Sequence, residues 1–199
     1  MAKAGLVDKA KLVMTNPSKF FQSIKSEGIG DAFKYLAILS LVYMVVLILA
    51  FSVPSLSILG GAEALAALLG PYGSAIGFAL AIVLYIAGLV LSFVSVGIIH
   101  LFVKLMKGKG DYGATYKALI YASTPSMLLG WIPYIGMIIG LYTLYLELKG
   151  VSILHKIGMG RALLAVLVIP VAVVFVLVFA FGFLGALLLI QGQFFSPLA

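Results

Sequence analysis

The side chains that could support chemistry in this chain are few, and most of them lie inside long apolar stretches. The chain has two histidines, His100 and His155, and no cysteine, which excludes thiolate metal sites and a cysteine nucleophile. No His-Glu-x-x-His pattern accompanies the histidines, and no second set of carboxylates or histidines stands at metal-ligand spacing. We therefore expect no catalytic residue, no cofactor and no metal site, and a protein that is not an enzyme.

The most polar point within an apolar run is a set of hydroxyls around a proline, Ser123, Thr124, Pro125 and Ser126. A proline inside a helix removes a backbone donor and frees a carbonyl about one turn earlier, and hydroxyl groups can satisfy that carbonyl. Two interpretations follow from this pattern. One is a kink with hydroxyl compensation; the other is a small polar cavity that binds an ion or a solute, which would indicate a small transporter or channel.

Two charges of opposite sign also stand inside apolar runs. Lys117 and Glu147 lie at a similar distance along the chain from Trp131, on either side of it. Since buried charges in lipid usually pair or reach the interface, we expect these two side chains to form an interfacial pair.

Composition indicates that the elements holding these residues are membrane helices. Of 199 residues, 64% are hydrophobic and only 10% are charged, with a mean hydropathy of +1.25. A spanning helix needs about 20 mostly apolar residues. We predict an all-α, polytopic helix bundle of five transmembrane helices and a multi-pass protein of the cell membrane. The expected spans are 33–53, 72–105, 112–130, 132–148 and 161–190, with a tight hairpin between the third and fourth.

The positions of the 13 basic residues support five crossings. Basic residues gather in cytoplasmic loops, and here they fall in alternate loops: six before or at the start of the first span, four around the loop between the second and third spans, and three in the loop before the fifth. The N-terminus is therefore expected in the cytoplasm and the C-terminus outside. Such residues also attract anionic lipids, which makes membrane lipids the expected partner and nucleic acid not a partner. The candidate lipid contacts are Lys104, Lys107, Lys109, Lys156 and Arg161.

Residues 1–32 are expected to form a cytoplasmic segment of their own, before a transmembrane domain at 33–199. Thr15 or Asn16 can cap a helix that begins near Pro17. Its apolar residues, Phe20, Phe21 and Ile24, gather on one side, which predicts an amphipathic helix lying in the membrane interface. The alternative is a soluble linker.

Small residues at helical spacing predict close helix packing. Gly73 and Gly77 form a Gly-x-x-x-Gly motif, and Gly136 and Gly140 form another. Such faces let backbones approach closely. They serve either packing within the chain or a homo-oligomer interface.

The second half of the chain has a recognisable pattern: a Gly-Asp-Tyr-Gly start, a proline within the third span, and aromatic and small residues after it. The stretches that carry this pattern are 110–118, 121–125, 132–136, 141–146, 150, 155–157 and 161–163. With the Asn-Pro lead-in, this pattern resembles that of the Yip (Ypt-interacting protein) domain family.

This resemblance implies a helical membrane protein with five spans and no enzymatic activity. It implies a membrane scaffold or adaptor, because eukaryotic members of the family act in vesicle trafficking with small GTPases of the Rab type, through a long cytosolic N-terminal region. About 30 residues precede the first span here, which is typical of a short prokaryotic member.

Overall fold

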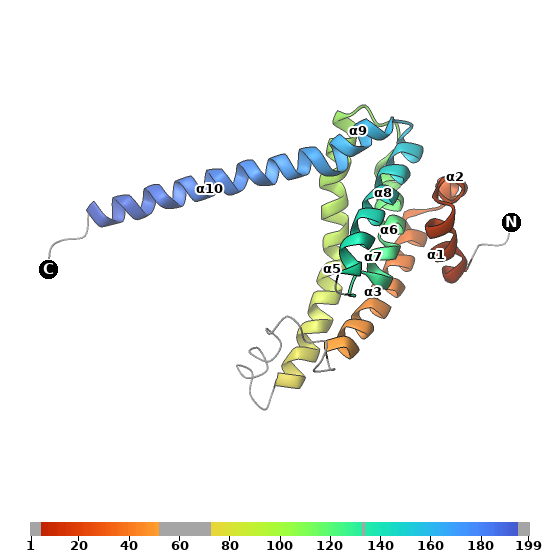
Figure 1. The fold of residues 1–199 in the computed structure, drawn as a ribbon, viewed down its shortest axis with the longest axis horizontal. Helices are drawn as coiled ribbons and strands as arrows, with labels where there is room; N and C mark the ends of the chain where they lie inside the picture. Colours follow the sequence, from red (N-terminus) through yellow and green to blue (C-terminus); the bar gives the residue numbers. More distant parts are fainter. Residues whose placement is uncertain (1–4, 52–72, 133, 195–199) are drawn as a thin grey trace.

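The computed structural model describes residues 5–51, 73–132 and 134–194, and all elements in these ranges are helical. Figure 1 shows their arrangement. In chain order they are α1 (Leu6–Thr15), α2 (Pro17–Ser23), the short helix η1 (Ile24–Ser26), α3 (Ile29–Phe51), α5 (Gly73–Leu105), α6 (Tyr112–Ala122), α7 (Thr124–Leu129), α8 (Ile135–His155), α9 (Met159–Leu163), the π-helical turn η4 (Leu164–Val168) and α10 (Ile169–Phe194).

Helix α6 is the centre of the bundle. It packs most extensively against α8 and also contacts α1, α3 and α5 (Figure 1). Nine of its eleven residues are buried, among them Tyr116 and Tyr121. A helix enclosed by protein on nearly all sides can carry polar residues that lipid would not tolerate, provided that they are hydrogen-bonded.

Four of the described helical segments are long and apolar enough to cross a membrane. They are Ile29–Leu47, Ile76–Leu105, Ile135–His155 and Met159–Phe179. The expected third span, 112–130, is not among them. It consists of two shorter helices, α6 and α7, because the helix is interrupted at Ser123 immediately before the Thr124-Pro125 start of α7. The expected hairpin between the third and fourth spans is present, formed by α6 and α7 against α8.

The N-terminal segment packs into the bundle. Asn16 caps α2 by accepting a hydrogen bond from the Lys19 amide at 3.2 Å, and Pro17 is its first residue, as the sequence predicts. The side chains of Phe20, Phe21 and Ile24 are at most 2% exposed and share one core with α3, α6 and α8. We expected these three side chains to enter the lipid interface, and that was wrong, because their apolar face is covered by protein.

Helix α10 extends away from the bundle and touches α5 only slightly (Figure 1). It departs where η4 replaces α-helical bonding. Pro170, one residue beyond Ile169, lacks the amide that would bond the carbonyl of Val166, and π-helical turns and prolines are the usual causes of such a change in a helix. Beyond this point Val171 and Phe175 are 56% and 62% exposed, which leaves an apolar surface suited to lipid.

Close approach of α2 to α8 depends on Gly150. A Cβ at this position would lie 2.8 Å from two ring atoms of Phe21, which is fully buried and has no room to move. Gly140 lies on the same helix with nothing within 4 Å of its would-be Cβ.

We therefore expect Gly150→Ala to lower the free energy of unfolding by about 1–3 kcal/mol, the usual penalty for overpacking a core. Gly140→Ala is the matched control, and its effect should be neutral or slightly stabilising because alanine favours helix. Thermal unfolding in detergent measures both. Equal stability of the two variants would contradict the close packing of Phe21 on Gly150.

Candidate functional site

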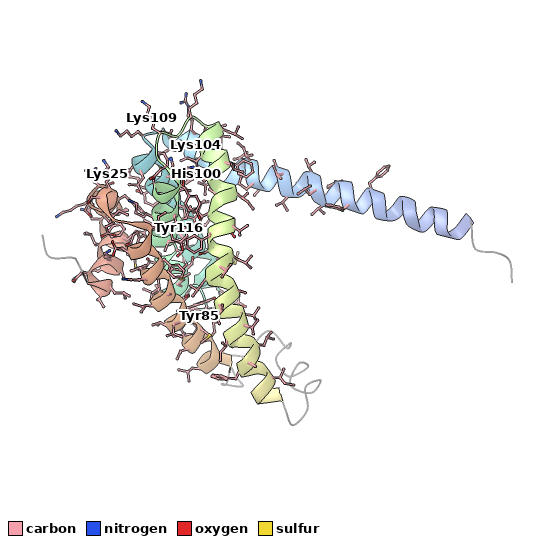
Figure 2. All side chains as sticks on the ribbon, turned by 180° about the vertical axis from the view of Figure 1, so that it is seen from behind. Lys25, Tyr85, His100, Lys104, Lys109 and Tyr116 are labelled. Carbon is pink, nitrogen blue, oxygen red and sulfur yellow. The ribbon has the colours of Figure 1, made fainter. Side chains whose placement is uncertain are left out.

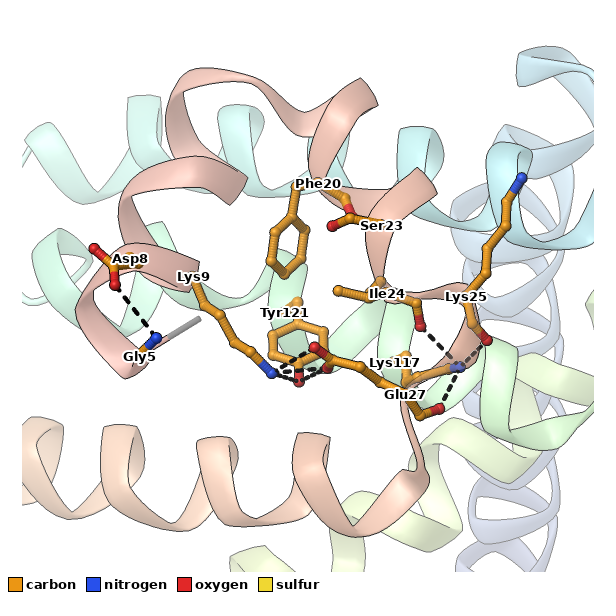
Figure 3. Close-up of polar contacts among 10 residues, drawn as sticks. All are labelled: Gly5, Asp8, Lys9, Phe20, Ser23, Ile24, Lys25, Glu27, Lys117 and Tyr121. Carbon is orange, nitrogen blue, oxygen red and sulfur yellow. Dashed lines mark hydrogen bonds and ion pairs between the residues drawn. The ribbon is translucent and has the colours of Figure 1, made fainter. Parts of the chain in front are cut away.

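The most completely satisfied charge in the bundle is that of Lys117. Its ammonium group, on α6, donates to the backbone carbonyls of Ile24, Lys25 and Glu27 at 3.2, 3.0 and 2.7 Å (Figure 3). These carbonyls belong to η1 and the residue after it, where a helix end leaves acceptors without partners. An ammonium group has three donors, and all three are used.

A second charged contact lies beside the first. The Lys9 ammonium forms an ion pair with the Glu27 carboxylate at 2.7 Å, and the Tyr121 hydroxyl donates to the same carboxylate at 2.6 Å (Figure 3). Lys9 also lies 5.2 Å from the centre of the Tyr121 ring. This group joins α1, the segment before α3, and α6, so that the N-terminal segment is held at two neighbouring points.

The expected pair of Lys117 with Glu147 is not formed. The ammonium group of Lys117 points toward η1, and its donors are taken by carbonyls. Lys117 and Glu147 lie at a similar distance along the chain from the hairpin turn, which places them at a similar depth. This distance does not indicate which side of its helix each residue occupies. Glu147 is partly buried on α8, with no hydrogen bond or ion pair to any described residue.

The hydroxyls around Pro125 support the structure. Thr124 donates to the carbonyl of Tyr121 at 2.6 Å, which is the carbonyl that the missing amide of Pro125 leaves free. Thr124 also shares a hydrogen bond with the hydroxyl of Tyr35 at 2.8 Å, and Ser126 shares one with Thr143 at 2.6 Å. Ser123 donates to the carbonyl of Ile120. The interruption with hydroxyl compensation is therefore present.

Two histidines from different helices meet through one hydroxyl. Nδ1 of His100, on α5, lies 2.7 Å from Oγ1 of Thr115, on α6, and this oxygen lies 2.8 Å from Nε2 of His155, the last residue of α8. Thr115 and His155 are fully buried, and Nδ1 of His155 has no hydrogen-bond partner. This contact could not be predicted from the sequence, since 40 residues separate Thr115 from His155.

The candidate lipid contacts gather at the same end of the bundle, where α5 and α8 terminate and α9 begins (Figure 2). Lys104 donates to the carbonyls of Gly108 and Gly110. Lys107 and Lys156 take positive φ angles of 64° and 54° at the helix ends, where glycine is the usual residue. The exposed basic residues at this end are Lys104, Lys107, Lys109, Lys156 and Arg161.

These arrangements bind helices together and present positive charge. No group of three or more metal-ligating side chains occurs in the part of the chain that the structure describes. Sequence reasoning missed the roles of Lys9, Glu27 and Tyr121, because Tyr121 lies 94 positions from Glu27 and 112 positions from Lys9.

Comparison with known proteins gives one match. The family model of the Yip1 domain matches residues 11–181, which is most of the chain. No curated protein and no solved structure matches it. The matched region includes α6, the hydroxyls around Pro125 and the lysine-rich end of the bundle.

We expect Lys117→Met to lower the free energy of unfolding by about 3 kcal/mol, because it removes charge-assisted hydrogen bonds and leaves carbonyls without donors. Trypsin should then cut faster at the lysines of residues 9–25. Lys25→Met is the control, since its exposed side chain can change while its carbonyl remains. Unchanged proteolysis of Lys117→Met would show that the N-terminal segment is held by its apolar contacts alone.

Proposed function

Because the chain belongs to the Yip1 domain family, we propose that this multi-pass membrane protein is a non-enzymatic scaffold or adaptor that organises lipids and membrane partners. The observation that carries the proposal is that the polar side chains inside the bundle bond helices to one another. The described hydroxyls around Pro125, and the charges of Lys9, Lys117 and Glu27, are engaged in holding helices to one another. A protein of this kind acts through its surface.

The proposed topology is five crossings, with the N-terminus in the cytoplasm and the C-terminus outside. In this arrangement α6 and α7 together form the third crossing, shielded from lipid by α3, α5 and α8. The basic end of α5, α8 and α9 then faces the cytoplasm, in agreement with the positive-inside rule. The cell membrane is the proposed location.

The proposed partners are anionic lipids at the basic end and a second copy of the chain. Among the described residues, no atom lies within 4 Å of a would-be Cβ on Gly77, Gly88 or Gly140, so these glycines do not serve close packing within the part of the chain that the structure describes. They are available to a homo-oligomer. Small GTPases are proposed only by analogy with eukaryotic relatives.

Transport is the less favoured function. A site for an ion or solute needs polar groups that are free to bind it, and the hydroxyls of Thr124 and Ser126 are already paired with Tyr35 and Thr143.

The topology can be tested with single cysteines, because the chain has none of its own. Tyr134→Cys lies in the hairpin turn at a site 83% exposed, and Lys109→Cys lies in the exposed connection between α5 and α6. Five crossings place the two on opposite sides, so an impermeant maleimide added to intact cells should label only Tyr134→Cys. Labelling of both or of neither would place them on one side, and this topology would then be wrong.

Lipid binding is expected to depend on the basic end. Replacing Lys107 and Lys109 by glutamine should weaken binding of anionic lipid by about 2 kcal/mol, or about thirtyfold, since each basic residue near the surface contributes about 1 kcal/mol. Native mass spectrometry with phosphatidylglycerol measures this. The matched control replaces Lys11 and Lys19, which are exposed on α1 and α2.

An equal loss in both double variants would indicate general attraction by charge and no preferred lipid site. The scaffold itself would be contradicted by solute flux in reconstituted vesicles that falls on Thr124→Val or Ser126→Ala.

A further inference from the structure

The buried ring of His155 lies directly beneath the connection between α5 and α6. A Cβ built on Gly108 or Gly110 would come within 3.0 or 2.9 Å of Nδ1 of this ring. The amide of Lys109 donates to the carbonyl of His155 at 3.0 Å. The connecting segment, residues 107–111, therefore lies against His155 at the end of α8, and hydrogen bonds of Gly108 and Gly110 with Val103 and Lys104 also hold it to the end of α5.

A neutral ring fits this position, whereas a charged ring does not. The Thr115 hydroxyl has one hydrogen to donate and can accept others, so at least one of the two ring nitrogens that it contacts must carry a proton. Two neutral histidines meet this requirement. Charging His155 places N–H groups on both of its nitrogens, and the one on Nδ1 then points at the glycine backbone with no acceptor.

The neighbouring groups do not compensate for such a charge. The titratable or charged groups acting on His155 are His100 and Lys104 from α5, which repel a positive ring, and Asp111 from the connection. Asp111 caps α6 by accepting a hydrogen bond from the amide of Ala114 at 2.8 Å. The carbonyls of Gly108 and Gly110 already accept from Lys104. On α6 the group in contact is the uncharged hydroxyl of Thr115, and Lys156 and Arg161 nearby on α8 and α9 are exposed and positive.

We propose that His155 is a proton-sensitive latch. With the ring neutral, the segment 107–111 is closed over the end of α8; protonation of the ring releases the segment together with Lys107 and Lys109. Release gives Nδ1 access to water, which supplies the missing acceptor. The latch does not depend on what the protein binds, and it changes how two of its most exposed positive charges are presented.

A buried reporter tests the release. Ala114 is 8% exposed, and its Cβ lies 2.8 Å from where a Cβ of Gly110 would stand, so a thiol there is covered by the closed segment. We would label Ala114→Cys in full-length protein in phosphatidylcholine nanodiscs from pH 7.5 to 5.5. Ala122→Cys is the control, because Ala122 is also buried on α6 but is distant from the segment.

The expected result is a ratio of the two labelling rates that rises by up to about tenfold per pH unit below about 6.5, where a solvated histidine binds a proton. The ratio also removes the effect of pH on the thiols. It should stay constant in a His155→Gln background.

If the His155→Gln protein does not fold, the protonation of His155 can be measured directly. Selective ¹⁵N labelling of histidine gives two sets of signals, because the chain has two histidines, and His100→Gln assigns them. The charged form of His155 should appear over the pH range in which Ala114→Cys becomes reactive. A flat rate ratio, a rise that persists in His155→Gln, or ionisation of His155 without a rise would each overturn the latch.

Discussion

The buried ammonium group of Lys117 is the interaction on which the arrangement of the bundle depends. A charge at 6% exposure is unfavourable unless every donor finds an acceptor, and the end of η1 supplies three carbonyls that would otherwise lack donors. The carbonyls thus provide acceptors for the buried ammonium group, and the ammonium group provides the donors that these carbonyls lack. The N-terminal segment is held in one position, and the apolar contacts of Phe20 and Phe21 against α6 and α8 follow from that placement.

The bundle separates its two kinds of surface clearly. Polar groups face inward along α6, where they are hydrogen-bonded, while α5 and α10 expose apolar side chains over much of their length. The outward face suits lipid, and five exposed basic residues gather at the end where α5 and α8 terminate. Such a distribution favours a protein that binds at its surface, and the pair of His100 and His155 lies close to that charged end.

Much of the fold could be predicted from the sequence, because the long apolar runs, the cap at Asn16 and the proline at position 125 are local signals. The candidate site could not. Apolar residues at 20, 21 and 24 are expected on a helix that faces lipid and equally on one that faces protein, and only the packing of α2 against α6 and α8 decides between them. Lys117 was likewise expected to pair with Glu147, and no pattern in the sequence indicated that the carbonyls of residues 24, 25 and 27 would take its donors. A contact such as that of Thr115 with His155 cannot be predicted from spacing along the chain, because 40 residues separate the two.

The distance along the chain between Lys9 and Tyr121 has a consequence for biosynthesis. These residues are 112 positions apart, and the ribosome delivers the N-terminal segment long before the helix that receives it. Helices α3 and α5 must therefore enter the membrane while α1 and α2 still lack their binding surface. Their lysines remain in water during this interval, which assists the orientation of α3. Docking onto α6 then completes assembly after most of the chain has been made.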